Sequence, residues 1–327
     1  FNIQLLKFNY IIFLYFMRAV LFPGQGSQYV GMGSDFYEKY DLVKKNFDIV
    51  DKTLGFPLSK IILNGPDSEL KLTQNTQPAI MTVGVSIFNV LNKHFNHNLN
   101  AAKFFAGHSL GEYTALVCAG SLTIEKAAYL LNERGKAMQD AVPSGEGSML
   151  AVLGMTIEEV EKEVGSLSAP GVCEIANDNS EGQVVISGDK DAVNSFKSFA
   201  KSSGAKLTID LNVSAPFHCK LMEEAAIKIN SEINKTLFNE FKIPVISNVE
   251  AIPCIDVSEF KSLLSKQITM TVRWRESILF MESEGVKKIF EIGPGNVLSG
   301  LVKRIDKDVI INSINSEEDI KNININD

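Results

Sequence analysis

The stretch FFAGHSLGEYTALVCAG at 104–120 constrains the fold of this chain most, because it places Ser109 between two glycines. The apolar run at 103–106 predicts a buried strand, and 112–119, which contains neither glycine nor proline, predicts a helix. A G-x-S-x-G sequence between a strand and a helix is typical of a nucleophile elbow, which exposes the serine oxygen at the edge of a sheet. The same pattern also fits a plain tight turn, so other parts of the chain have to distinguish the two.

A second predicted strand at 19–22 ends in the glycine-rich loop PGQGS at 23–27, and a helix is predicted over 31–40. The loop does not match a dinucleotide-binding fingerprint, because Tyr29 stands where G-x-G-x-x-G requires a glycine, and it lacks a P-loop lysine. It does bring backbone N–H groups to the carboxyl end of a strand, where open α/β sheets bind ligands. This loop is therefore a candidate ligand contact and not a phosphate site.

The order of the predicted elements changes at about residue 145. The order becomes β-α-β-β-α-β, with strands at 148–153, 173–176, 183–187 and 205–211 and helices at 156–164 and 189–203. This order is typical of ferredoxin-like subdomains and predicts one at 145–212, inserted into a larger α/β core. The core takes up 17–144 and 213–310, and 311–327 is interpreted as a polar C-terminal tail.

Charge and composition exclude several classes of function. The net charge of −7 and the lack of a dense lysine or arginine block disfavour a nucleic-acid partner. The four cysteines are far apart and lack C-x-x-C spacing, which indicates a reducing compartment and no disulfide framework. His94 and His97 have no acidic or cysteine neighbour, so we expect no metal site.

The chain opens with an apolar, aromatic segment before Met17. Its apolar run at 8–16 is too short to span a bilayer, and no A-x-A-like cleavage site follows it. We therefore expect no membrane partner and a functional chain that starts near Met17. Residues 1–16 are interpreted as an upstream extension or as the remnant of a targeting peptide.

A serine hydroxyl needs a neighbouring base before it acts as a nucleophile at neutral pH. Among the four histidines, His218 is the best candidate, because SAPFH at 214–218 forms a proline-defined loop of the kind that carries catalytic side chains. Capping of the helix predicted after it is the alternative role for His218. His108 adjoins Ser109 and suits the lining of a pocket better. Cys219 lacks an elbow, which disfavours it as the nucleophile.

Arg134 lies amid apolar and small residues on a helix predicted from about 121 to 141. An arginine in such a place can hold a carboxylate through two parallel charge-assisted hydrogen bonds. A pair with Glu133 or a solvated helix face explains the same pattern, and composition alone favours that simpler interpretation.

Six motifs, in this order along the chain, carry a resemblance to one family: LFPGQGSQYVGMG, GHSLGEYTALVCAG, RGKAMQDAVPSGEGSMLAVLG, ANDNSEGQVVISG, SAPFHCKLMEEAA and FEIGPGNVLSGLVKRI. From about residue 19 to 304 the chain resembles the malonyl-CoA:acyl carrier protein transacylases of bacterial and plastid type II fatty acid synthesis. The resemblance implies an α/β-hydrolase-like core with a parallel sheet, plus an inserted ferredoxin-like (βαββαβ) subdomain. It also implies an acyltransferase, specifically an S-malonyltransferase.

The resemblance implies roles for the reacting residues. Ser109 would carry the malonyl group as an ester, and His218 would be its base. A backbone carbonyl near Gln267 would orient His218 in place of an acidic third member. The implied reaction is ping-pong, first from malonyl-CoA to the serine and then to the phosphopantetheine thiol of holo-acyl carrier protein, with no permanently bound cofactor.

The resemblance assigns the substrate contacts as well. Arg134 would bind the free malonyl carboxylate, and the backbone N–H groups of Gln25 and Leu110 would form the oxyanion hole. His108 would line the site beside the serine, and Asn177 would face it from the small subdomain.

Acyl carrier proteins are acidic, so a net-negative enzyme needs a local basic surface to bind one. The candidate residues for that surface are Lys136, Arg273, Arg275, Lys303 and Arg304. We expect a monomer in the bacterial cytoplasm, with a plastid-type organelle as the alternative if 1–16 is a targeting remnant.

Three rival functions remain at this stage. A serine esterase or thioesterase-type hydrolase would use the same elbow but would have no need of Arg134. A non-catalytic relative that only binds carrier protein disagrees with the presence of Ser109, His218 and Arg134. An acyltransferase for another extender unit, such as methylmalonyl, is disfavoured by the stretch APFH at 215–218, which resembles the malonyl-type signature more closely.

Overall fold

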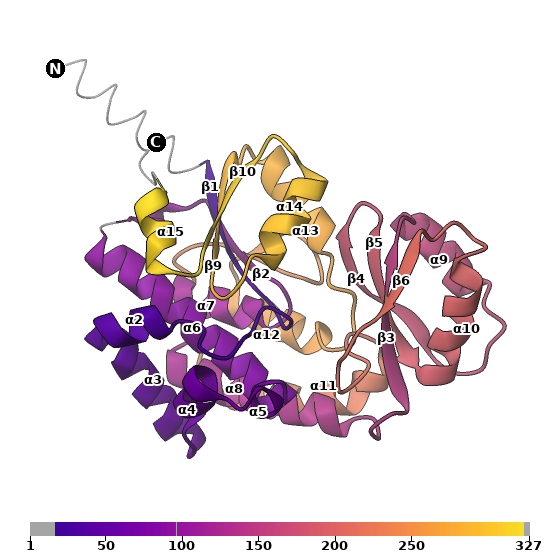
Figure 1. Cartoon of the computed structure of the whole chain (residues 1–327), viewed down its shortest axis with the longest axis horizontal. Helices are drawn as coiled ribbons and strands as arrows, with labels where there is room; N and C mark the ends of the chain where they lie inside the picture. The colour runs from indigo at the N-terminus through magenta and orange to yellow at the C-terminus, as the bar shows by residue number, and fades with distance from the viewer. Residues whose placement is uncertain (1–16, 96, 324–327) are drawn as a thin grey trace.

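The computed structural model describes residues 17–95 and 97–323, so the predicted extension at 1–16 lies outside the described residues. Its larger sheet has six strands in the order β10-β9-β1-β2-β7-β8 (Figure 1). All neighbours in it pair in parallel except β7 and β8, which are antiparallel. The strands are β1 (Arg18–Phe22), β2 (Phe104–Gly107), β7 (Val245–Ile246), β8 (Pro253–Cys254), β9 (Lys288–Ile292) and β10 (Ile310–Ile314).

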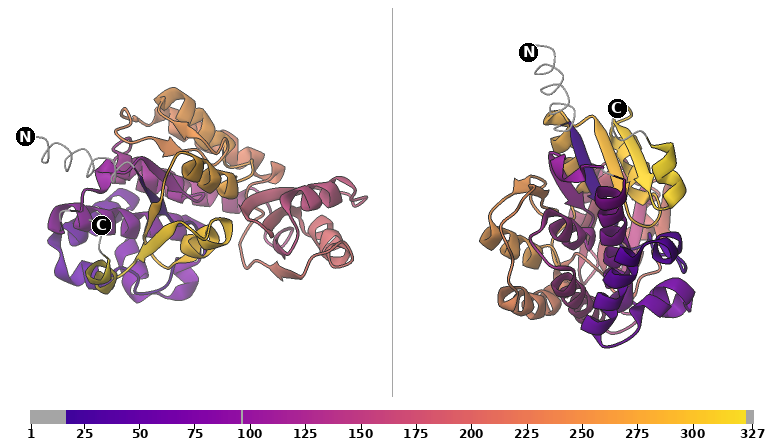
Figure 2. Two further views of the ribbon diagram at one scale, coloured as in Figure 1. Left: turned by 90° about the horizontal axis from the view of Figure 1, so that it is seen from above. Right: turned by 90° about the vertical axis from the view of Figure 1, so that its left-hand side faces the viewer.

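A second sheet of four antiparallel strands, in the order β4-β5-β3-β6, forms a separate body beside the first. The segment contains β3 (Gly147–Leu153), α9 (Ile157–Gly165), β4 (Cys173–Ser180), β5 (Gln183–Asp189), α10 (Lys190–Ala200) and β6 (Leu207–Asp210). The predicted element order β-α-β-β-α-β is thereby confirmed. The two sheets together make the protein a mixed α/β structure, and Figure 2 shows the smaller body projecting from one side of the larger.

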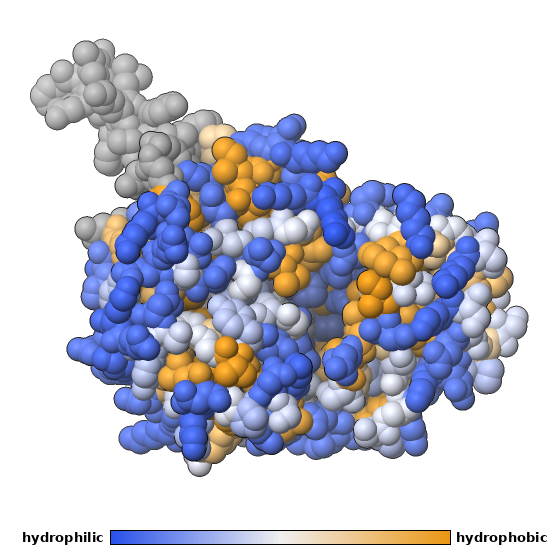
Figure 3. Space-filling model, viewed as in Figure 1, coloured by the Kyte–Doolittle hydropathy of each residue, from blue (hydrophilic) through white to orange (hydrophobic). Residues whose placement is uncertain are grey.

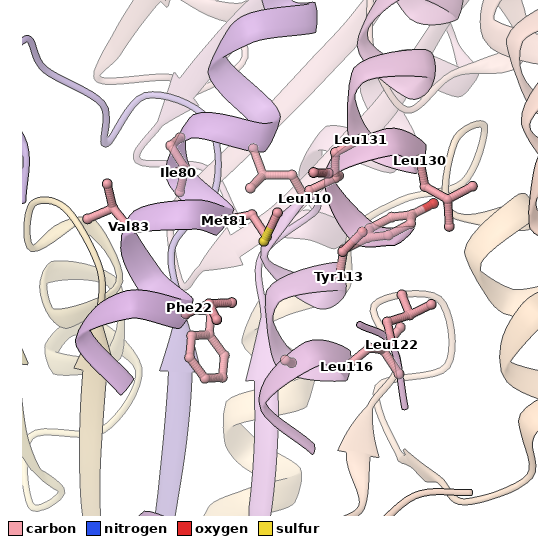
Figure 4. Packing of buried hydrophobic residues seen from close by; sticks show 14 of the residues in the cluster. Phe22, Ile80, Met81, Val83, Leu110, Tyr113, Leu116, Leu122, Leu130 and Leu131 are labelled. Carbon is pink, nitrogen blue, oxygen red and sulfur yellow. The ribbon is translucent and has the colours of Figure 1, made fainter. Parts of the chain in front are cut away.

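Helices cover both faces of the six-stranded sheet, as the alternation of side chains along β1 requires. Val20 and Phe22 face the cluster that includes α6, α7 and α8, part of which Figure 4 shows. Ala19 and Leu21 face the opposite cluster, which includes α13 and α14. The helices of this body are α2 (Ser34–Lys39), α3 (Asp41–Leu54), α4 (Leu58–Asn64), α5 (Asp67–Leu70), α6 (Thr73–His94), α7 (Gly111–Ala119), α8 (Ile124–Asp140), α11 (Glu223–Lys235), α12 (Val257–Lys266), α13 (Trp274–Ser283), α14 (Val297–Ile305) and α15 (Glu317–Asn322).

Two glycines allow strand β2 and helix α7 to approach closely. A Cβ atom at Gly107 would overlap the backbone of Gly111, and one at Gly111 would overlap the carbonyl oxygen of Phe22 on β1. Only glycine fits at such a close approach of two backbones. The predicted strand and helix on either side of Ser109 are confirmed, and the glycines place the start of α7 against the carboxyl end of β1.

Some predicted elements differ from the observed ones. The helix expected over 31–40 is shorter, because Gly31 and Gly33 adopt positive φ values of 90° and 74° ahead of α2. The interpretation of 311–327 as a tail without elements is wrong for its first part. There β10 pairs in parallel with β9, and α15 follows it, with Ile314 and Ile320 buried. Within the described ranges, none of the helices combines the length and apolarity that crossing a bilayer requires.

Candidate active site

Ser109 and His218, which are far apart in the sequence, meet at the end of the six-stranded sheet. The Ser109 Oγ lies 2.9 Å from the Nε2 of His218. Ser109 occupies the turn between β2 and α7 with a φ of 53°, and His218 has a φ of 58°. Both values fall in the left-handed region, which is rare for residues other than glycine. The elbow interpretation therefore has the geometry it needs, since a base reaches the exposed hydroxyl.

The ring of His218 is oriented by a backbone carbonyl. Its Nδ1 lies 2.7 Å from the carbonyl oxygen of Gln267, the residue after α12. A carbonyl oxygen can only accept, so Nδ1 carries the proton and Nε2 is left as the acceptor for the Ser109 hydroxyl. Burial, aided by the nearby Arg134 guanidinium, lowers the pKa of His218 to about 3, which keeps the ring neutral.

Arg134 on α8 is 1% exposed and points into the same site. One terminal nitrogen donates to Gln77 Oε1 at 2.8 Å, and the other donates to Gln267 Oε1 at 2.8 Å and to Ser109 Oγ at 3.1 Å. The pair with Glu133 considered above is absent, because Glu133 contacts Lys136 instead. Among residues 17–95 and 97–323, no carboxylate lies within ion-pair distance of the guanidinium. Burial lowers the pKa of Arg134.

The two residues expected to form the oxyanion hole lie near the serine in different ways. Leu110 follows Ser109 at the start of α7, and Gln25 lies in the loop after β1. Both residues line the same cavity as Ser109. Within the part of the chain that the structure describes, neither N–H group donates to a protein acceptor. Both N–H groups therefore remain without an intramolecular acceptor in the described residues.

The cavity has a volume of about 320 Å³ and lies between the two bodies. Ser109, Arg134 and His218 line it from the larger body, and Asn177 on β4 lines it from the smaller one. Figure 3 shows the surface hollowed between the two bodies. Its apolar wall includes Met138, Met149 and Phe217. A small acyl chain with a polar end fits such a lining.

His108 and Asn177 lie where the two bodies meet. The Nε2 of His108 lies 2.9 Å from Asn179 Oδ1, and its ring packs on Trp274 with centroids 5.4 Å apart. Burial lowers the pKa of His108, so it too is neutral. Asn177 forms a β-bridge with Val272. Both side chains were expected at the site, and both line its cavity.

Hydrogen bonds and an ion pair join the two bodies beside this bridge. The Asp178 N–H donates to the Val272 carbonyl at 3.0 Å, and the Val272 N–H donates to the Ala176 carbonyl at 2.9 Å. The buried Asp178 carboxylate also pairs with Arg275 on α13 at 3.0 Å. These contacts fix the edge of the cavity that carries Asn177.

The sequence analysis missed several residues that hold the site. Asn248 Oδ1 accepts from the backbone N–H of Ser109 at 2.7 Å, and its amide donates to the carbonyl of Gly107 at 2.7 Å. Gln77 anchors Arg134, and Glu112 on α7 accepts from the backbone N–H of Asn248. These contacts join segments more than fifty residues apart, so no local sequence pattern predicts them.

The cysteines lie apart from this chemistry. All four are free, and Cys219 beside His218 is buried, which raises the pKa of its thiol to about 11. A thiol in that state has almost no nucleophilic thiolate at neutral pH. Among the described residues, no three histidine, cysteine, aspartate or glutamate side chains gather as a metal-binding group.

An elbow serine with a histidine in reach, beside a buried arginine, defines an enzyme that moves acyl groups. The chain belongs to the family of the acyl transferase domain, which matches residues 20–319. It is 41% identical, over 304 residues, to the malonyl CoA-acyl carrier protein transacylase of Bacillus subtilis (strain 168), an alignment that covers 93% of this chain and 95% of the relative.

Two solved structures are similar along nearly the whole chain. One is an acyl carrier protein S-malonyltransferase from Vibrio cholerae, with a TM-score of 0.90, 40% identity and coverage of 94% of this chain and 99% of that one. The other is a type II PKS acyl-carrier protein in complex with its malonyl-transacylase. That match has a TM-score of 0.90 and 37% identity, and it covers 93% of this chain and 97% of that one.

Proposed function

We propose that this protein transfers the malonyl group of malonyl-CoA to the phosphopantetheine thiol of acyl carrier protein, through a malonyl ester on Ser109. One observation carries the proposal: the Ser109 Oγ lies 2.9 Å from a neutral imidazole and 3.1 Å from a buried guanidinium. Nucleophile, base and a group that binds a carboxylate thus meet at one atom. The malonyl transferase names of the relatives in Bacillus subtilis and Vibrio cholerae support the same function.

In the first half-reaction, Ser109 attacks the carbonyl carbon of the malonyl thioester while His218 Nε2 takes the hydroxyl proton. The carbonyl oxygen becomes an oxyanion, held by the N–H groups of Gln25 and Leu110. One such donor typically lowers a barrier by about 3 kcal/mol. The carbon–sulfur bond then breaks, and the coenzyme A sulfur leaves with the proton from His218.

The second half-reaction uses the same groups in reverse. The thiol of the carrier protein gives its proton to His218 and attacks the ester carbonyl carbon. The oxyanion forms again at Gln25 and Leu110, and the bond to the Ser109 oxygen breaks. His218 returns the proton to that oxygen, which restores the free enzyme.

Arg134 gives the site its preference for a free carboxylate. In the structure its charge faces two glutamine oxygens and the serine, and its Nε has no hydrogen-bond partner among the described residues. A buried guanidinium without a carboxylate in direct contact is costly, so the carboxylate of a malonyl group stabilises it. An acetyl group supplies no such partner, and the site discriminates against it.

The carrier-protein surface is a further part of the proposal. The solved complex of a related malonyl-transacylase with its acyl-carrier protein supports such a partner. Of the five basic candidates, Lys136, Arg273 and Arg275 form ion pairs within the protein, and Arg304 donates to Gln183. An acidic partner therefore has to compete for most of these cations, and Lys303 is the candidate with no such pair in the described residues.

We infer that 145–212 is a ferredoxin-like subdomain inserted into an α/β-hydrolase-like core, whose first half is 17–144 and whose second half starts at 213 and continues through β10 and α15. The strand order β4-β5-β3-β6 and the element order of that segment support the inference. A monomer in the bacterial cytoplasm remains our prediction for the assembly and location, with no bound cofactor.

The decisive test is intact-mass analysis after incubation with malonyl-CoA. We expect wild type to gain one malonyl group and Ser109→Ala to gain none. Addition of holo-acyl carrier protein should move the adduct to the carrier thiol. Rapid release of free malonate without carrier protein would instead identify a hydrolase, and a wild type that gains no mass would remove the proposed function.

A further inference from the structure

Glu112 is a fully buried carboxylate in the first turn of α7, three residues after Ser109. Its Oε1 accepts from the backbone N–H of Asn248 at 2.7 Å. Its Oε2 accepts from the side-chain Nε2 of Gln267. A buried carboxylate is costly even when it is hydrogen-bonded, and burial raises the pKa of Glu112 to about 8. Packing alone gives no reason for an acid at this position.

The hydrogen bonds around Gln267 have a fixed direction. Arg134 is donor-only, so the side of the Gln267 amide that faces it has to be the oxygen, at 2.8 Å. The Nε2 of Gln267 then faces the opposite way, where it meets Glu112 and, at 3.0 Å, the carbonyl oxygen of Ser109. The Asn248 N–H and the Gln267 Nε2 both point at Glu112, so both of its oxygens serve as acceptors, and Glu112 and Arg134 agree on one orientation of the amide between them.

The same residue also serves the base. The backbone carbonyl of Gln267 accepts from His218 Nδ1, while its side chain holds Arg134. Gln267 is therefore the point where the base and the carboxylate-binding arginine share one support. Glu112 holds the side-chain amide of Gln267 by accepting a hydrogen bond from its Nε2.

We propose that Glu112 is a positioning residue, which sets the preference for malonyl over acetyl groups by holding the Gln267 amide in the orientation that anchors Arg134. The inference rests on the proposed function, because it assumes that Arg134 binds the malonyl carboxylate. Glu112 touches no substrate atom in this arrangement. It acts through Gln267, whose oxygen keeps the guanidinium turned toward Ser109.

The first variant is Glu112→Gln, which has nearly the same size. Its side-chain oxygen can keep the bond to the Asn248 N–H, but its amide nitrogen then faces the Nε2 of Gln267, donor against donor. Relief of that conflict turns the Gln267 amide and places its N–H groups against Arg134. We expect the ratio of malonyl to acetyl transfer to fall by about tenfold or more, with acetyl transfer changed by less than about threefold.

Glu291→Gln is the matched control. Glu291 on β9 is also fully buried, and it accepts from the backbone N–H groups of Leu298 and Ser299, away from the cavity. Its replacement removes a buried carboxylate of the same kind, so it should lower the melting temperature without a change in the malonyl-to-acetyl ratio. The comparison separates loss of selectivity from general loss of stability.

A double-mutant cycle tests whether Glu112 acts through Gln267. Gln267→Met removes the side-chain amide but keeps the backbone carbonyl that His218 needs. We expect it to lower the malonyl-to-acetyl ratio about as much as Glu112→Gln does. The ratio in the double variant should be no lower than the ratio in either single variant. Should Glu112→Gln fail to fold, the ratio in Gln267→Met carries the test, and an unchanged ratio there overturns the proposal.

The outcomes distinguish this proposal from the proposed function. If wild type forms no malonyl adduct, the function itself is wrong. If wild type does form the adduct, two results overturn the role of Glu112 alone. One is a malonyl-to-acetyl ratio in Glu112→Gln that rises or stays the same, as it does when both transfers fall equally. The other is additive effects in the cycle. A higher malonyl-to-acetyl ratio in Glu112→Gln would show that Glu112 acts on Arg134 only as a nearby negative charge, which weakens the attraction of the guanidinium for the malonyl carboxylate.

Discussion

At the scale of single residues, the reacting pair is held by its backbone. Ser109 and His218 both have positive φ values, which cost free energy for residues with a side chain. Neighbouring contacts impose these conformations: Asn248 holds the backbone N–H of Ser109, and Gln267 holds the ring of His218. The two reacting atoms therefore meet in a fixed geometry before any substrate arrives.

The pKa of His218 leads to a prediction about pH. A base works only in its neutral form, and burial together with Arg134 lowers the pKa of His218 to about 3. As the pH falls, acylation of the free enzyme should therefore persist well below about pH 6.5, the ordinary value for histidine. Arg134→Gln removes the positive neighbour, so its acidic limb should move to higher pH. Between about pH 4 and pH 8 the rate of adduct formation should stay flat for wild type, whereas the acidic limb of Arg134→Gln should move toward that range. Coincident limbs near 6.5 would contradict this account.

Arg134→Ala should slow malonyl transfer sharply, because it removes the guanidinium that we propose as the partner of the substrate carboxylate. Acetyl transfer should change much less, so a preference of up to about 10⁴ would narrow toward unity. Kinetics with both coenzyme A thioesters measure the effect. Lys126→Ala, a change to a partly exposed lysine on the same helix, is the control. Equal losses for the two acyl groups would argue against a carboxylate role for Arg134.

At the scale of elements, the elbow depends on close contact between β1, β2 and α7. A side chain at Gly111 would collide with the backbone of Phe22, whereas Gly300 on α14 has open space around its Cβ position. Gly111→Ala should therefore destabilise the fold by about 3 kcal/mol or more. Gly300→Ala should stabilise it by up to about 1 kcal/mol, since alanine favours the helix. Chemical denaturation measures both changes, and similar values for the two variants would refute the packing argument.

Many of the helices and strands were predictable from the sequence. Apolar runs bounded by glycine and proline located β2, α7 and the alternating elements of 145–212. Strand β10 was missed, because Ile310–Ile314 is a half-exposed edge strand that pairs, within the described ranges, with β9 alone. Such a strand has little hydrophobic pattern of its own, and its pairing depends on a segment some twenty residues away.

The site was predictable in its reacting groups and not in its supports. The motifs carried Ser109, His218 and Arg134, and the structure brings these three side chains together. Asn248 and Gln77 accept long-range hydrogen bonds from Ser109 and Arg134, and Glu112 accepts one from Gln267. A buried polar residue looks the same in a sequence whether or not it has such a partner.

At the scale of the whole molecule, the cavity exists only because two bodies meet. Arg134 and Ser109 come from one body and Asn177 from the other, and the pair of Asp178 with Arg275 joins them beside the cavity. Loss of one partner from a buried ion pair is costly, so this contact resists separation of the bodies. The volume open to the acyl group is therefore set by their fixed relation.

Lys71 at the rim of the cavity yields a prediction about the donor. Its side chain is 57% exposed and lines the cavity beside the loop that carries Gln25. Coenzyme A carries phosphates, so Lys71→Glu should raise the KM for malonyl-CoA by about fivefold, with kcat nearly unchanged. The effect should fade as ionic strength passes about 0.5 M. Lys45→Glu, on the exposed face of α3, is the control. A KM insensitive to both changes would exclude a role for Lys71.

Because its cysteine thiols stay protonated, the number of active molecules in a sample of this protein can be measured from the acyl group bound to Ser109. Burial raises the pKa of Cys173, Cys219 and Cys254 to about 11, and that of Cys118 well above its usual value. None of these sulfurs competes with Ser109 for an activated acyl group near neutrality. A radioactive malonyl donor, quenched in acid, should then report the fraction of competent molecules in any preparation directly, with no thioester background to subtract.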